Sequence, residues 1–272
     1  MHRCSTSAGF LRPSLRETPK MATSYGALCT DFYLNQKLAL KLDLPSERET
    51  ILHLFDRIRR SMPDMDRFRR YDGELALESS KHEGEYTWLA LRRASIRTGH
   101  VNPSTMDDAH KLHQLILEVS PYHLTISPLD IDYIELMFGF DLECKGNHDE
   151  VIFDALFHDS PMANLTQVPG YEDARALDVQ PIFGVALCDE GNLQAFFEIK
   201  TRAKSRRGDD SRYHDEPISL FLTVRQYGPI EQIDQLPKIY EQLHDHCETL
   251  ASERLIPDLL TPIARQIISS ST

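Results

Sequence analysis

Residues 138–152 read FGFDLECKGNHDEVI, and the pattern of apolar and polar residues changes inside this stretch from that of a strand to that of a helix. In its first half apolar and polar residues alternate, as on a strand with one buried face. From Asn147 the pattern is that of a helix start, because Asn is a strong N-cap and Glu150 has capping-box spacing from it. The stretch predicts a strand at 132–144 followed directly by a helix at 148–158.

The same change of pattern occurs earlier in the chain. A shift of 100 residues places Leu38, Leu40, Leu42 and Leu44 on Phe138, Phe140, Leu142 and Cys144. After one inserted residue, Ser46 and Glu49 match Asn147 and Glu150, so Ser46 is the expected cap of the earlier helix. We therefore expect an internal repeat, either a true duplication or two instances of one supersecondary unit.

Outward from these two stretches, hydrophobic periodicity predicts the remaining elements. The first half is expected to hold a strand at 32–42, a helix at 45–62, strands at 71–79 and 85–97, a helix from Ser104, and a strand at 123–127. The second half is expected to hold strands at 181–188, 193–202 and 218–227, and helices from 233 to 268 that end at Pro257 and Pro262.

These elements predict an α+β fold in which two similar β-α-β-β-α units form one broad antiparallel sheet or two facing sheets, with helices on one face. The first unit covers 25–128 and the second covers 129–272, with an additional strand and the C-terminal helices. Residues 1–24 are expected to be a disordered tail or an over-long start. Trp88, with Tyr86 and Ala90 on its strand, is expected to pack against a helix.

Composition narrows the class of protein. The formal net charge of −12 argues against a nucleic-acid partner, whose binding proteins are basic. The longest apolar run, at 182–187, is far too short to cross a membrane. Five cysteines without a C-x-x-C spacing indicate buried free thiols in a reducing compartment, so we expect a soluble, cytoplasmic protein.

The polar face of the 132–144 strand contains the candidate site. Because same-face neighbours on a strand are about 7 Å apart, Asp141 and Glu143 could share an ion with a third group, or pair with an arginine. Arg93 and Arg97 are expected to share one face of their strand. The candidate ligand-binding residues are Glu135, Asp141, Glu143, Arg93, Arg97 and Arg225.

Other motifs favour structural roles. The Asn147–Glu150 cluster is explained as a helix start, with His148 expected to face solvent. The pair His110 and His113 lacks the Glu of the H-E-x-x-H pattern, and the HDHC run at 244–247 places Cys247 on an apolar stripe. No phosphate-binding glycine loop is present, and neither a metal site nor a cofactor is predicted.

Two functions remain open at this stage. The first is a non-catalytic binding or scaffold protein with an unknown protein or small-molecule partner, acting through an open sheet face or the groove between the repeats. The alternative is a metal-dependent hydrolase or transferase whose dispersed carboxylates lie on the sheet face.

Overall fold

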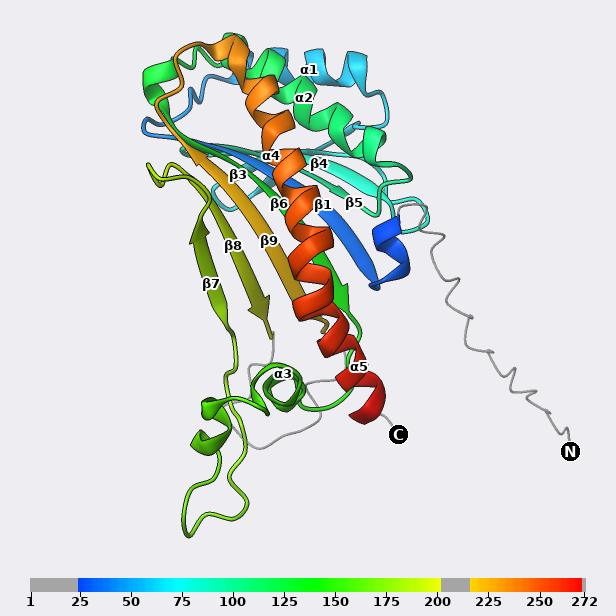
Figure 1. Cartoon of the computed structure of the whole chain (residues 1–272). Coiled ribbons are helices and arrows are strands. Elements are labelled where there is room, and N and C mark those ends of the chain that lie inside the picture. Colours follow the sequence, from blue (N-terminus) through cyan, green and yellow to red (C-terminus); the bar gives the residue numbers. More distant parts are fainter. Residues whose placement is uncertain (1–23, 202–215, 271–272) are drawn as a thin grey trace, which may run out of the picture.

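The computed structural model describes residues 24–201 and 216–270, which form an α+β fold around one antiparallel sheet of nine strands (Figure 1). The strands are β1 (Asp31–Leu40), β2 (Arg67–Tyr71), β3 (Glu74–Glu78), β4 (Tyr86–Arg92), β5 (Ser95–Val101), β6 (Ile131–Leu142), β7 (Ile182–Ala186), β8 (Leu193–Lys200) and β9 (Ile218–Tyr227). Their order across the sheet is β2-β3-β4-β5-β1-β6-β9-β8-β7. The predicted fold class and antiparallel pairing are confirmed, in the one-sheet form.

The main helices are α1 (Arg48–Ser61), α2 (Met106–His123), α3 (His148–Phe157), α4 (Leu236–Leu250) and α5 (Thr261–Ser270), with a π-helical segment η6 (Ala251–Leu260) between the last two. Short 3-10 turns occur at Ser24–Ala27, Pro128–Asp130, Pro161–Leu165 and Ile233–Gln235. None of the helices in the described part of the chain has the length and hydropathy needed to cross a bilayer.

Helices α1, α2 and α4 lie on the same side of the sheet, and the hydrophobic core lies between them and the strands (Figure 1). Every second residue of the central strands faces this core, as the period of two requires. Phe32 of β1, Phe138 of β6 and Leu222 of β9 are all fully buried there. Helix α3 lies instead beyond the end of β6, against α5.

One of the predicted strands is a hairpin: the stretch 85–97 turns at Arg93 and Ala94, between β4 and β5. The turn was not predicted because these two residues are not of the types that usually form turns. The predicted strand at 71–79 corresponds to β3, and β2 before it was not predicted; the two are joined by a turn at Gly73, whose φ of +69° favours glycine. The residues 123–127 form no strand. The first half of the chain thus contributes five strands and the second half four, so two matching β-α-β-β-α units are not confirmed.

The C-terminal helix does not end at its prolines. Helix α4, η6 and α5 follow one another without a break, and Pro257 lies inside η6. A proline cannot donate the usual backbone hydrogen bond and clashes with the preceding turn of an α-helix. In the wider π turn each hydrogen bond joins residues five apart instead of four. The chain can therefore stay helical past the proline.

The start of α3 explains the polar cluster at 147–150. The Asn147 side chain accepts hydrogen bonds from the backbone N–H groups of Asp149, at 3.1 Å, and Glu150, at 3.4 Å, which confirms the predicted N-cap. His148 is buried rather than solvent-facing, and its Nε2 lies 3.2 Å from the carbonyl oxygen of Cys144. Asp149 is also buried and accepts a hydrogen bond from the backbone N–H of Val179 at 2.9 Å. The cluster therefore anchors α3 and the following loop.

Other predictions about local chemistry had mixed outcomes. Helix α1 begins after Glu47 without a side-chain cap, so Ser46 is not its cap, and Thr105 rather than Ser104 caps α2. The four cysteines in the described residues are free, as predicted. The predicted tail at 1–24 lies outside the described residues except for Ser24.

Candidate functional site

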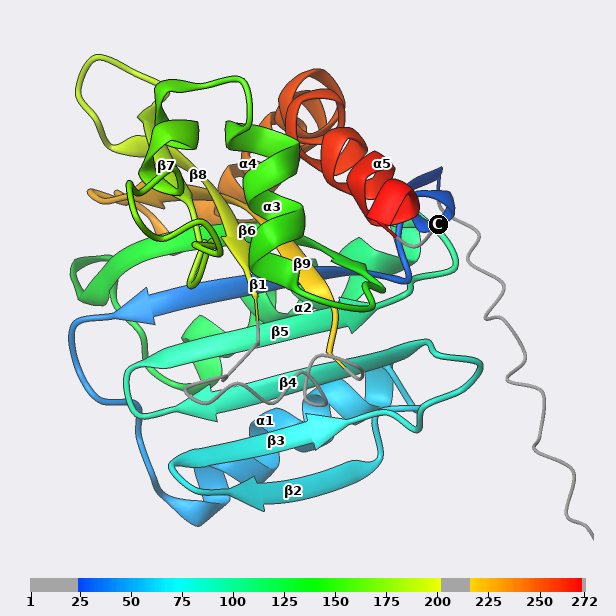
Figure 2. The same cartoon turned by 90° about the horizontal axis from the view of Figure 1, so that it is seen from below.

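The candidate site is the face of the sheet opposite to α1, α2 and α4 (Figure 2). Along β1 and β6 the residues that point to this face alternate with the core residues and are only partly buried. Partly exposed aromatic, charged and amide side chains line it, which gives the face the composition of a binding surface.

A row of charged residues crosses the middle of this face. The strand register places Arg97 of β5 opposite Lys37 of β1, Lys37 opposite Glu135 of β6, and Glu135 opposite Arg225 of β9. The row contains three cations and one carboxylate. Since directly opposite residues on neighbouring strands are about 5 Å apart, these charges act on each other.

The carboxylate of this row, Glu135, is already paired with an arginine. Glu135 Oε2 accepts hydrogen bonds from Arg225 Nε at 2.8 Å and from Arg225 Nη2 at 2.6 Å. The Arg225 guanidinium also donates to the Tyr227 hydroxyl at 2.9 Å and lies 4.3 Å from the centre of the Tyr133 ring. This ion pair is largely shielded from solvent, so Glu135 is an anchor for Arg225 and is poorly placed to act as a base.

The other two cations have no carboxylate partner among the described residues. Lys37 Nζ contacts the Tyr133 hydroxyl and lies 4.6 Å from the centre of that ring. Arg97 forms no hydrogen bond or ion pair with any residue in the described ranges, and its Nε is buried. Charges of the same sign that face each other across two paired strands lower the stability of the sheet. Arg97 and Lys37 are such a pair, and together they form a region of uncompensated positive charge.

Arg97 lines a hollow of about 300 Å³ on this face. The hollow is also lined by Tyr71, Glu74, Ala76, Glu78, Tyr86, Trp88 and Arg92. Its two carboxylates are engaged, because Glu74 pairs with Arg92 at 2.5 Å and Glu78 accepts a hydrogen bond from the Tyr71 hydroxyl at 2.8 Å. Arg97 is therefore the cation of this hollow that is left for a ligand.

Trp88 lies on the open face beside Gly99, not against a helix as expected. A Cβ built on Gly99 would lie 2.3 Å from the indole ring, so glycine is required for this close approach. The expectation was wrong because Leu89 and Leu91, not Trp88, occupy the core side of β4.

The structure divides the six predicted site residues into two groups. Glu135, Asp141, Arg97 and Arg225 all lie on the open face. Arg93 lies in the β4–β5 turn, 85% exposed and paired with Asp43 at 2.9 Å, so it does not share a face with Arg97. Glu143 follows the end of β6 and is exposed, with its backbone N–H bound to the Thr30 hydroxyl at 3.1 Å.

Asp141 lies at the far end of the face from the charged row. Its Oδ1 accepts a hydrogen bond from the Ser219 hydroxyl at 2.7 Å and lies 3.3 Å from the Tyr33 hydroxyl. Asp31 is its neighbour across the β1–β6 pair.

Lys37 and Trp88 were missed as site residues. The period-two pattern of β1 places its apolar residues on the core side and Lys37 on the open face. Which strand then lies beside β1 is a long-range property, and no spacing in the sequence indicates it.

His110 and His113 were predicted to have structural roles and not to bind a metal. Each is at least partly buried and has a ring nitrogen close to a hydroxyl group. His110 Nδ1 lies 2.5 Å from the Tyr240 hydroxyl, and His113 Nδ1 lies 2.6 Å from the Thr98 hydroxyl, both between α2 and its neighbours. No group of three or more His, Cys, Asp or Glu side chains within 24–201 and 216–270 is placed to hold a metal ion.

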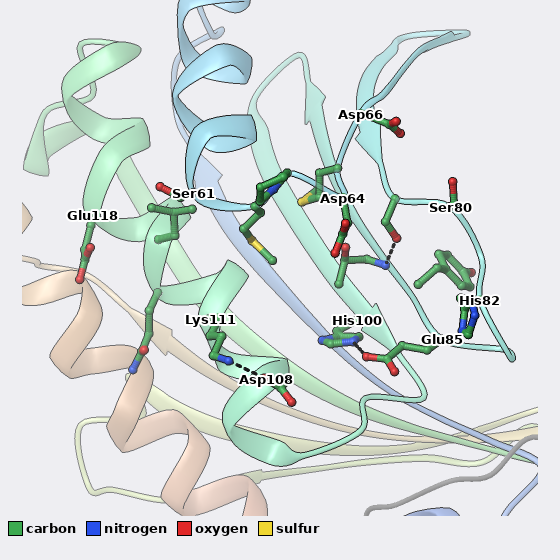
Figure 3. A pocket seen from close by; sticks show the side chains of 18 residues that line it. Ser61, Asp64, Asp66, Ser80, His82, Glu85, His100, Asp108, Lys111 and Glu118 are labelled. Atoms are coloured by element: carbon green, nitrogen blue, oxygen red, sulfur yellow. Dashed lines mark hydrogen bonds and ion pairs between the residues drawn. The ribbon is translucent and has the colours of Figure 1, made fainter.

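A larger hollow, of about 950 Å³, lies between α2, the α1–β2 loop and the β3–β4 loop (Figure 3). On its wall Glu85 lies 2.8 Å from His100 Nε2 and accepts a hydrogen bond from Ser104 at 2.7 Å. Asp108 and Lys111 form a second pair. Because these side chains bind one another, most of their hydrogen-bonding groups have a partner without a ligand.

The chain matches no protein-family model, and no curated protein matches it.

Proposed function

We propose that this chain is a non-catalytic binding protein that holds an anionic small molecule on the open face of its sheet. The observation that carries the proposal is the guanidinium of Arg97, which has no partner among the described residues. It lies in a hollow on that face, directly across from Lys37. The ligand class that fits is a molecule with a carboxylate or phosphate group and an apolar or planar part.

The chemistry of Arg97 suits this class of ligand. A guanidinium presents paired N–H donors that match two oxygens of a carboxylate or phosphate. Lys37 adds a second positive charge nearby, while Trp88 and Tyr86 offer rings for the rest of the ligand. A hollow of about 300 Å³ is at the small end of ligand sites, which favours a small molecule over a polymer.

The alternative of a metal-dependent hydrolase or transferase has less support. Its carboxylates would have to converge, yet Glu135 is paired with Arg225 and Asp141 lies at the other end of the face. A binding role needs only the charge and shape that the face already has.

The two halves of the chain also contribute equally to the charged row, which leads us to propose that they are versions of one unit. Outward from the centre the strand order is β1-β5-β4-β3-β2 on one side and β6-β9-β8-β7 on the other. Lys37 and Glu135 face each other across the centre, and Arg97 and Arg225 each lie one strand further out. A ligand on this row would contact both halves.

The proposal is tested by thermal unfolding and isothermal titration with sodium pyrophosphate and sodium citrate, at ionic strength held constant with NaCl. An anion at a hundred times its Kd stabilises a protein by about 2.7 kcal/mol, so the Tm of the wild type should rise by several degrees. Arg97→Met should abolish this rise. Arg93→Met, which removes the same charge from an exposed turn, should retain it.

The same variant gives an independent result without ligand. Because Arg97→Met relieves the repulsion with Lys37, the urea midpoint of the ligand-free protein should stay equal or rise. If neither anion raises the wild-type Tm, or if both arginine variants respond alike, the proposed site is wrong.

A further inference from the structure

The two edges of the sheet are built differently. At one edge, β2 reads RFRRY and carries three arginines. At the other edge, β7 reads IFGVA and carries no charge. Natural sheets protect exposed edge strands with charges, prolines or bulges, because unpaired N–H and C=O groups accept another strand. Edge β2 has this protection, and edge β7 does not.

Strand β7 is also uncovered. Ile182 is 63% exposed and Phe183 is 66% exposed, on opposite faces of the strand. Within the described residues its hydrogen-bonded neighbour is β8 alone, which leaves the outer side of β7 without a partner strand. Figure 1 shows β7 at the margin of the molecule with no helix beyond it.

An apolar hollow of about 480 Å³ adjoins this edge on the helix-covered side. Its apolar lining comes from β7, β8 and the C-terminal helix, and comprises Phe183, Val185, Ala186, Leu187, Phe197, Leu250 and Leu259. Among the described residues that line it, Arg254 and Asp258 carry charge, one of each sign. Exposed apolar surface beside an open strand edge is typical of a protein–protein contact.

We propose that β7 pairs with β7 of a second copy of this chain, antiparallel and centred on Gly184, so that one sheet runs through both copies. The strand is self-complementary in this register: Ile182 lies opposite Ala186 of the other copy, and Phe183 lies opposite Val185. Apolar residues then meet apolar residues at every position, and no charges of like sign face each other. A two-fold axis through Gly184 makes the interface isologous, as in most homodimers.

The hollow beside β7 adds to this contact. Across the same axis, the Phe183 ring of each copy is brought to the apolar wall of the other copy. The rim residues Arg254 and Asp258 have opposite signs, so a two-fold arrangement offers each a partner of opposite charge. This inference concerns a different edge of the molecule and does not depend on anion binding at Arg97.

The experiment measures the mass of the full chain by light scattering and sedimentation velocity between about 5 and 200 µM, since dimers depend on concentration. The wild type should have twice the mass of the chain at the upper concentrations. Phe183→Lys should shift it to a monomer, because lysines would enter the apolar contact. Phe68→Lys, the same substitution on the protected edge β2, should remain dimeric.

A cross-link tests the register itself. Residues opposite one another in an antiparallel pair have Cα atoms about 4.5–5.5 Å apart, within the range that a disulfide spans. Gly184→Cys should therefore give an oxidised dimer, with the Phe196 ring, 3.1 Å from the added Cβ, moving by a few tenths of an ångström. Ala186→Cys should not give an oxidised dimer, because residue 186 faces Ile182 of the other copy and not a second cysteine.

A wild type that stays monomeric over the whole concentration range would overturn the proposal. The partner of β7 would then be an extended segment of another protein. A dimer that persists in Phe183→Lys would also overturn it. Circular dichroism and Tm close to the wild-type values show that Phe183→Lys is folded. If that variant does not fold, the cysteine pair decides the outcome.

Discussion

Ser46 and Asn147 occupy matching positions in the two halves of the sequence, yet only Asn147 caps its helix. The Asn147 side chain accepts two backbone hydrogen bonds at the start of α3. Helix α1 begins one residue later than the matching position would place it, after Glu47, and has no side-chain cap. A capping pattern is local, but the residue at which the chain turns into a helix depends on how the preceding strand and loop are held.

Replacing Asn147 with Ala should lower the free energy of unfolding by about 1 kcal/mol, because two backbone N–H groups lose their acceptor. Ser46→Ala should leave it unchanged within about 0.5 kcal/mol, as expected for a surface substitution away from such contacts. Urea midpoints with equal m-values measure both. Equal losses in the two variants would contradict the difference seen between α1 and α3.

At the scale of elements, the contact between α2, α4 and the sheet contains histidines that burial keeps neutral. The Thr98 hydroxyl donates to Gln36 Oε1 at 2.8 Å, so His113 Nδ1 must donate to Thr98. The other nitrogen of His113 is buried without a partner among the described residues. Burial lowers the pKa of His113 well below its usual value. Burial and then the neighbouring His244 lower the pKa of His110 to about 4.

These shifts predict a loss of stability in mild acid. The pKa values of His110 and His113 are lowered in the folded state, so the unfolded chain takes up protons first as the pH falls. Their contribution to stability is complete above the unfolded pKa of about 6.5 and is lost as the pH falls toward about 4. Each such histidine adds a slope approaching about 1.4 kcal/mol per pH unit in that window.

Urea unfolding at a series of pH values between about 8 and 4.5 measures this slope. His110→Gln should reduce it, since a group that titrates differently in the two states is removed. His246→Gln is the matched control, because His246 lies on α4 with its side chain exposed. A slope that is the same in both variants would contradict the role of His110. Of the charged groups around His110, the Glu248 carboxylate opposes the shift by favouring the protonated imidazole.

For the whole molecule, the central pair β1–β6 joins the two halves of the chain into one structure. Tyr33 and Lys37 of β1 pair with Gly139 and Glu135 of β6. A single core of buried residues extends from α1 to the C-terminal helix. Separating the halves would expose the longest strands of the sheet as open edges, and such edges associate with other chains.

We therefore expect one cooperative unfolding transition for the whole chain. Calorimetric and van't Hoff enthalpies should agree, as they do for a single cooperative unit. Residues 24–128 and residues 129–270, each expressed separately, should aggregate or remain unfolded. The unfolding transition of the intact chain should therefore be absent from either half alone. Two resolved transitions would indicate two independent units.

Local sequence pattern was sufficient to predict the elements whose structure depends on neighbouring residues in the chain. Alternation along 132–144 placed Glu135 and Asp141 on one face of a strand, and β9 and α3 were predicted nearly to the residue. The hairpin turn between β4 and β5 was not predicted, because its residues, Arg93 and Ala94, are not of the types that usually form turns. Periodicity is a property of each strand alone, which is why it fixes which way side chains point and not what lies beside them.

The order of the strands in the sheet is a property of the folded chain, and the candidate site depends on that order. Within residues 24–201 and 216–270, Arg97 has no partner because β1 brings Lys37, not a carboxylate, to its side, while β9 brings Arg225 to Glu135. The open edge at β7 likewise exists because, in the part of the chain that the structure describes, no further strand lies beyond it in the sheet. Strand order is set by packing and pairing between residues far apart in the chain, and the pattern within a single strand does not contain that information.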